Sequence, residues 1–187
     1  FVNNGYVILK NFVEKKILND LYKLYTYCFD RLQKLYLKKK IKKDYELWAI
    51  IAIKYIQQTS TFKKYIRSPK IVSILKNLLG PDICCLGYNS LWVNRPDTRN
   101  TRMSLPPHTD AWTGTSINTI MVKVFLTDVD KHNGLTVYPG SHLSGMLPVK
   151  NRNLNDDDYN IKFDSVNLDN IKKGDIVIWH ALGLHCT

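Results

Sequence analysis

The pattern of apolar residues changes at Gly80-Pro81. Before this point apolar residues recur at helical spacing, and after it the chain consists of short β-rich runs separated by turn signals. Because no helical segments separate these runs, they favour an antiparallel sandwich or jelly roll over a parallel α/β sheet. The sequence therefore predicts a mainly β, α+β protein in which a helical amino-terminal layer covers a β-sandwich.

The first 80 residues are expected to form the helical layer. Apolar residues spaced three, four and seven positions apart mark one face of an amphipathic helix, at Phe12, Ile17, Leu18, Leu21, Leu24, Tyr25 and Leu32. A lysine-rich connection over 38–43 leads to a second helix over about 44–58. Ser68 as N-cap and Pro69 at the first helical position open a third helix, which Gly80-Pro81 closes.

The remaining residues, 81–187, are expected to form the sandwich. Turn signals rich in Gly, Pro, Asn and Asp separate the predicted strands, which are Ile83–Val93, Ile117–Leu126, Leu135–Tyr138 and Ile176–Trp179, followed by a short strand that carries His185. The polar, acidic segment 151–160 is expected to be a long loop. We expect one domain over 1–187, since this length suits a single hydrophobic core.

Composition excludes several classes of protein. The longest apolar runs are too short to cross a bilayer, and no secretory leader is visible. No two of the four cysteines have C-x-x-C spacing, so reduced thiols in a cytoplasmic protein are expected. The chain begins at Phe1 and not at Met, which predicts a piece excised from a longer polypeptide.

The net charge of +11 is unevenly distributed. Residues 1–80 carry 17 Lys/Arg against 5 Asp/Glu, a net charge of +12, whereas residues 81–187 carry 10 against 11, a net charge of −1. A basic half is compatible with a solvated helical face, with nucleic acid, with an anionic membrane surface or with an anionic substrate.

Two histidines and one carboxylate form a candidate metal site. His108-Thr109-Asp110 is an H-x-D tripeptide, and on an extended strand its two polar side chains would face the same side. Alone this pattern is common, but the later strand supplies a second histidine, His185. Two His and one carboxylate occupy one face of an octahedral iron(II) and leave three positions open. His180 is the alternative second histidine.

Four segments together resemble the phytanoyl-CoA dioxygenase family of iron(II)/2-oxoglutarate oxygenases. They are Phe1–Phe12, His108-Thr109-Asp110, the segment NGLTVYPGSH at 133–142, and Gly174–His185. The resemblance implies a double-stranded β-helix (jelly roll, cupin-like), with iron(II) and 2-oxoglutarate as cofactors. It implies hydroxylation of a small molecule with release of succinate and CO2. Asp110 favours hydroxylation, because related halogenases have a small residue in place of this carboxylate.

The co-substrate site departs from the family pattern. Members usually place an arginine beyond the distal histidine, to pair with the far carboxylate of 2-oxoglutarate, but this chain stops at Thr187. We read this as truncation at the carboxyl end. Lys123, inside an apolar strand, would need an anionic partner if buried, and we assign Lys123 and Thr187 to the co-substrate site. A solvent-facing Lys123 is the alternative.

A possible substrate rim consists of Asn94, Arg102, Trp112 and His142. Solvated or locally hydrogen-bonded roles are the alternative for these residues. Two other functions compete with the oxygenase hypothesis: an iron dioxygenase of the cupin type that does not use 2-oxoglutarate, and a non-catalytic, basic nucleic-acid-binding domain. No nucleic-acid-binding signature is evident, which disfavours the second. We expect a small-molecule substrate and no membrane partner, and the basic half favours an anionic substrate; the oligomeric state is not indicated.

Overall fold

The computed structural model describes residues 1–37, 56–86, 107–111, 116–129, 134–147 and 163–186. The chain divides into two compact units. A sheet unit comprises Phe1–Val13 and Arg95–Thr187, and a helical unit comprises Glu14–Asn94. The amino-terminal residues thus belong to the sheet unit, which joins segments from both ends of the sequence.

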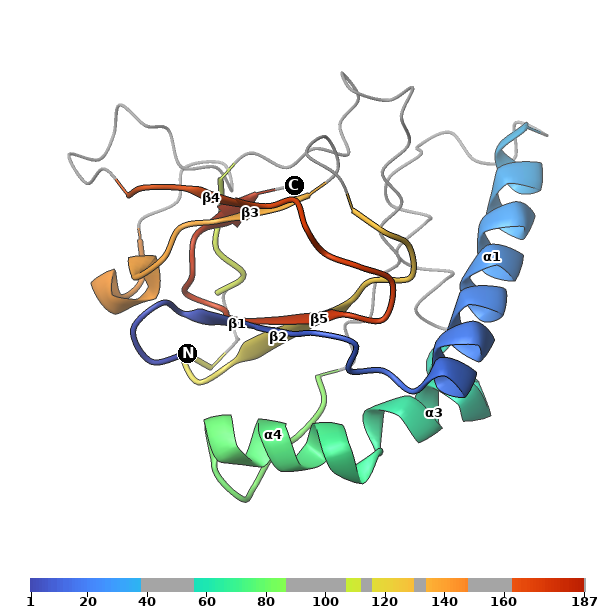
Figure 1. Ribbon diagram of the computed structural model, residues 1–187, viewed down its shortest axis with the longest axis horizontal. Helices are drawn as coiled ribbons and strands as arrows, with labels where there is room; N and C mark the ends of the chain where they lie inside the picture. The colour runs from blue at the N-terminus through green and yellow to red at the C-terminus, as the bar shows by residue number, and fades with distance from the viewer. Residues whose placement is uncertain (38–55, 87–106, 112–115, 130–133, 148–162, 187) are drawn as a thin grey trace. The chain divides into compact units, whose positions relative to one another are not determined.

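The described part of the sheet unit holds two antiparallel sheets of three strands each (Figure 1). In the first, β5 (Ile176–His180) lies between β1 (Tyr6–Leu9) and β2 (Ile120–Val124). In the second, β3 (Leu135–Val137) lies between β4 (Val166–Leu168) and β6 (His185–Cys186). The existence of the predicted strands at Ile117–Leu126, Leu135–Tyr138 and Ile176–Trp179 is therefore confirmed, with shorter bounds for the first two, together with the short strand of His185.

The two sheets share one apolar core. Successive side chains of a strand point to opposite faces of its sheet. One buried cluster contains Val177 and Trp179 from β5, Leu135 and Val137 from β3, and Leu168 from β4. Because this cluster draws on both sheets, the sheets face each other as the layers of a sandwich. Mixed helices and antiparallel sheets were expected, and both are present.

The described helical unit contains α1 (Lys15–Leu37), α3 (Ser60–Ile66) and α4 (Pro69–Leu79). As predicted, α4 begins at Pro69 after the N-cap Ser68, whose hydroxyl accepts the Ile71 N–H, and it ends at Gly80 with φ 96°. Apolar packing holds the unit together through a buried cluster of Cys28, Ile56 and Phe62. Of the second predicted helix, only 56–58 lie within the described residues, and these are helical.

Three expectations about local structure need correction. The helical pattern was extended back to Phe12, but α1 begins at Lys15, because the N–H groups of Phe12 and Val13 bond to the Gly174 carbonyl. Upstream, the run Tyr6–Leu9 pairs with β5 as a strand. Residues 83–86 of the predicted strand Ile83–Val93 are not in a strand, and its other residues lie outside the described ranges.

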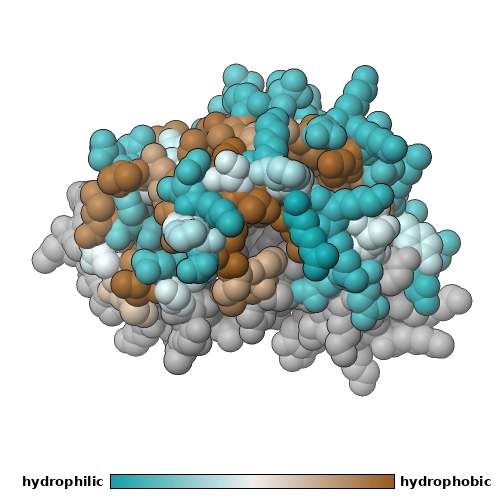
Figure 2. All heavy atoms as spheres, turned by 90° about the horizontal axis from the view of Figure 1, so that it is seen from below, coloured by the Kyte–Doolittle hydropathy of each residue, from teal (hydrophilic) through white to brown (hydrophobic). Residues whose placement is uncertain are grey.

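The described surface carries both apolar and hydrophilic side chains, as the face drawn in Figure 2 shows. On α3, α4 and the turn between them, the basic residues are exposed, namely Lys63, Lys64, Arg67, Lys70 and Lys76. Of the roles considered for the basic half of the sequence, a solvated helical face agrees with this exposure. None of the helices in the described ranges has the length and apolarity that crossing a membrane requires.

Candidate metal centre

Backbone hydrogen bonds bring the candidate ligands together. His108 and His185 form an antiparallel β-bridge, in which the His108 N–H donates to the His185 carbonyl (2.9 Å) and the His185 N–H to the His108 carbonyl (3.0 Å). The Asp110 N–H donates to the Ala181 carbonyl at 2.9 Å. The tripeptide was expected on a strand, but it forms only this single bridge, and Asp110 lies in a bend.

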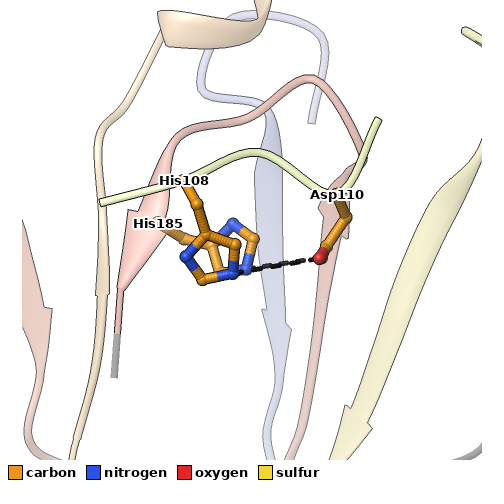
Figure 3. Close-up of side chains that lie close together, drawn as sticks. All are labelled: His108, Asp110 and His185. Atoms are coloured by element: carbon orange, nitrogen blue, oxygen red, sulfur yellow. Dashed lines mark ion pairs between the residues drawn. The ribbon is translucent and has the colours of Figure 1, made fainter. Parts of the chain in front are cut away.

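The three side chains converge on one point (Figure 3). Asp110 Oδ1 lies 3.9 Å from His108 Nε2, and Asp110 Oδ2 lies 3.3 Å from His185 Nε2. One ligand atom from each residue can be chosen so that all three lie within 4.8 Å of one another. Since the side chains are at most 15% exposed, the cluster is largely shielded from water.

Hydrogen bonding and burial keep His185 in the form that binds metal. Its Nδ1 lies 3.1 Å from the Gly183 carbonyl, so Nδ1–H donates there and Nε2 keeps its lone pair toward Asp110. Burial lowers the pKa of His185 well below its ordinary value, against the opposing charge of Asp110. A neutral imidazole with its free nitrogen directed at a carboxylate fits a divalent cation such as iron(II) or zinc.

Trp179 contacts two of the three candidate ligands. Its indole Nε1–H donates to Asp110 Oδ2 at 3.1 Å, and its ring lies 5.1 Å from the His185 ring, tilted by 54°. No role at the site was predicted for Trp179 from the sequence, so these two contacts were missed. Its parity on β5 was the available signal, because Trp179 shares a strand face with the core residue Val177.

Lys123 points between the two sheets. It stands opposite Val177 in the β2–β5 register and therefore shares the inward face of its sheet. Its Nζ lies 5.4 Å from the centroid of the Phe125 ring. Burial lowers the pKa of Lys123 to about 8, although the charge of Asp110 opposes this effect. The solvent-facing alternative for Lys123 does not match this orientation.

The other two described histidines lie outside the cluster. His180 Nδ1 accepts the Leu182 N–H at 3.1 Å, and its ring lies 5.5 Å from that of His142. His142 Nε2 lies 2.9 Å from the Val2 carbonyl, so His142 contacts the amino-terminal segment. Thus His180, the alternative ligand, is not brought to Asp110. The other expected site residues, Asn94, Arg102, Trp112 and Thr187, lie outside the described residues.

The PGSH segment, residues 139–142, is hydrogen-bonded to the residue next to the candidate ligand His185. Gly140 has a left-handed conformation (φ 79°) and precedes the short 3-10 helix Ser141–Ser144. The fully buried Ser141 hydroxyl donates to the Tyr138 carbonyl (2.6 Å) and accepts the Leu184 N–H (2.8 Å). This segment therefore fixes the residue that immediately precedes His185.

Comparison with known proteins agrees with this geometry. The family model described as phytanoyl-CoA dioxygenase (PhyH) matches residues 1–187. No curated protein sequence matches the chain.

Among solved structures, the chain is similar to the non-heme alpha ketoglutarate dependent epimerase SnoN from nogalamycin biosynthesis. The identity is 18% and the TM-score 0.57, over 99% of this chain and 71% of SnoN. The non-heme alpha ketoglutarate dependent carbocyclase SnoK from nogalamycin biosynthesis has 15% identity and a TM-score of 0.56, over 99% of this chain and 73% of SnoK. AviO1 from Streptomyces viridochromogenes Tue57 has 13% identity and a TM-score of 0.56, over 98% of this chain and 82% of AviO1. At these identities the likeness establishes a common fold.

Proposed function

Because the chain belongs to the phytanoyl-CoA dioxygenase family, we propose that it is an iron(II)- and 2-oxoglutarate-dependent oxygenase. One observation carries the proposal: two imidazoles and a carboxylate from segments far apart in the sequence meet in a shielded cluster. We propose further that the reaction is hydroxylation of a small molecule, with release of succinate and CO2. The neighbours SnoN and SnoK are named an epimerase and a carbocyclase, so the reaction type needs its own measurement.

His108, Asp110 and His185 would hold the iron as a two-histidine, one-carboxylate set, and the opposite face of the ion would stay open. When bound, iron(II) with 2-oxoglutarate and dioxygen supplies the oxidising chemistry. The chain's own residues bind and orient: the Gly183 carbonyl fixes the ring of His185, and the Trp179 indole donates to Asp110. One solved SnoN structure is named as a complex with Fe3+, alpha ketoglutarate and nogalamycin RO, which supports this pair of cofactors.

Lys123 is proposed to bind the far carboxylate of 2-oxoglutarate. Lys123 is half-buried on β2, and desolvation of its ammonium lowers its pKa, so an anionic partner would be favourable. A carboxylate beside Lys123 would offset the cost of that desolvation. Thr187 remains assigned to the same site, although it lies outside the described residues. Lys123 would then contribute positive charge to the co-substrate site.

The finer features of fold and setting are also proposals. The two facing antiparallel sheets, with fold neighbours among alpha ketoglutarate dependent enzymes, support a double-stranded β-helix. All four cysteines are free thiols, which supports a reducing compartment such as the cytoplasm. A preference for an anionic substrate is supported by the overall excess of basic residues in the sequence.

The decisive test is anaerobic titration with iron(II). His108→Ala and Asp110→Ala should each weaken iron binding by at least about 100-fold, since loss of an outer partner of a ligand alone costs about 10- to 100-fold. His180→Ala is the matched control and should bind iron like the wild type, because its ring lies outside the cluster. Unchanged affinity in Asp110→Ala would refute the assignment.

Succinate formation then identifies the reaction class. In air, the wild-type protein with iron(II), 2-oxoglutarate and a library of small anionic molecules should form succinate as oxygen is consumed. Oxygen consumption that is independent of 2-oxoglutarate would instead support the cupin-type iron dioxygenase.

A further inference from the structure

We propose that Trp179 is a positioning residue that holds both Asp110 and His185 in the orientation required for metal binding. The inference rests on the proposed metal site and adds a residue that is not itself a ligand. It is carried by three observations: a hydrogen bond, a ring contact, and the pairing of the Trp179 strand along both of its edges.

The hydrogen bond restricts the carboxylate. The terminal torsion of an aspartate side chain is broad, so its two oxygens are poorly fixed without a partner. The Trp179 Nε1–H, which can only donate, lies 3.1 Å from Asp110 Oδ2 in a part-buried environment. Hydrogen bonds to an ionised acceptor are among the stronger ones in proteins. With this bond, Oδ2 is held on the Trp179 side and Oδ1 faces His108.

The ring contact restricts the imidazole. The Trp179 and His185 rings lie 5.1 Å apart at 54°, and the His108 ring lies 4.3 Å from His185. Tilted arrangements at such separations are favourable for aromatic pairs. The His185 ring thus has an aromatic neighbour in Trp179 and another in His108, in addition to the hydrogen bond from its Nδ1 to Gly183.

The strand that carries Trp179 is firmly fixed. In β5, Trp179 pairs with Tyr6 of β1 and with Met121 of β2, so the strand is hydrogen-bonded along both edges. The three residues before Trp179 are completely buried. Asp110, in contrast, lies in a bend outside any strand. Trp179 therefore couples a ligand on irregular backbone to the most buried strand of the sheet unit.

The test separates the hydrogen bond from the packing. Trp179→Phe keeps an aromatic ring but removes the N–H donor, whereas Trp179→Leu removes both. The matched control is Ile178→Val, which trims a fully buried side chain on the other face of the same strand. Cobalt(II) serves as the probe: anaerobic titration gives the affinity, and the visible absorption bands report the coordination geometry. Thermal unfolding of each variant without metal measures stability.

Trp179→Phe should bind cobalt(II) about 10- to 100-fold more weakly and with altered visible bands. Ile178→Val should lower the melting temperature and leave cobalt affinity and bands unchanged. Wild-type affinity and bands in Trp179→Phe would overturn the proposal, as would equal losses of cobalt affinity in Trp179→Phe and Ile178→Val. Failure of the wild type to bind cobalt(II), or full binding by His108→Ala, would instead overturn the proposed metal site.

A measurement on the wild-type protein covers the case in which Trp179→Phe does not fold. The indole N–H resonance of Trp179, identified by NMR in the ¹⁵N-labelled chain, should exchange slowly with solvent and shift on addition of cobalt(II). Rapid exchange and no shift would show that this N–H is not bonded beside the metal, and the proposal would be wrong.

Discussion

Ser141→Ala should destabilise the sheet unit by about 2 kcal/mol. The buried Ser141 hydroxyl accepts the Leu184 N–H at 2.8 Å, and the alanine variant removes this acceptor. A buried donor left without a partner costs about 1–3 kcal/mol. The Tyr138 carbonyl contributes little to the cost, because it keeps a second hydrogen bond, from the Ser141 backbone N–H at 3.1 Å. Loss of one hydroxyl adds only a small cavity.

Urea unfolding at constant m-value measures this difference through the midpoint. Ser144→Ala is the matched control, since Ser144 is exposed on the same 3-10 helix, and it should remain within about 0.5 kcal/mol of the wild type. Iron affinity should also fall in Ser141→Ala, because Leu184 directly precedes His185. A Ser141→Ala midpoint that matches that of Ser144→Ala would refute the reasoning.

Two further predictions concern charge. Burial alone would raise the pKa of Asp175, but hydrogen bonds from the N–H groups of Lys172 and Asn11 and the ammonium of Lys10 lower it. Ionised Asp175 therefore stabilises the folded state at pH values above its unfolded pKa of about 3.9. This stabilisation is lost as the pH falls through the lower pKa of the folded state. Asp175→Asn should lower the free energy of unfolding, measured with urea, by about 2–3 kcal/mol at pH 7 and by less at pH 3. An equal difference between the variant and the wild type at both pH values would contradict this prediction. Lys123→Met should weaken 2-oxoglutarate binding about 10-fold or more by calorimetry, as expected for a lost charged hydrogen bond. In the wild type that affinity should decline as the pH rises past about 8, where Lys123 loses its proton; a flat profile, or one that the methionine variant shares, would remove Lys123 from the site.

Local signals predicted the elements whose ends are defined by neighbouring residues. Ser68, Pro69 and Gly80 marked α4 correctly because capping depends on adjacent backbone groups. The strand β1 was missed because a short apolar run such as Tyr6–Leu9 does not by itself distinguish a strand from a helix, and its pairing with β5 joins residues far apart in the sequence. Strand β4 was missed for the same reason, since it pairs with β3 from a distant part of the sequence.

The candidate site was predictable in its residue types but not in its supporting contacts. His185 and His180 were both candidates, since the sequence does not show how the chain turns between β5 and β6. The structure ends β5 at His180, whose side chain alternates with that of Trp179, and places His185 in a bridge with His108. Alternation along β5 places Trp179 on the inward face, but its contact with Asp110 also depends on how the segment of Asp110 lies against β5, which the sequence does not show.

The position of β5 late in the sequence has a consequence for folding during translation. The central strand of the first sheet comes late in the sequence, and both its neighbours, β1 and β2, are made before it. The bridge between His108 and His185 likewise waits for the later partner. Contacts of such long range form slowly and only after their loops close. A nascent chain that lacks residues 176–185 lacks His185, so metal capture at the proposed site would be a late step that follows the pairing of β5.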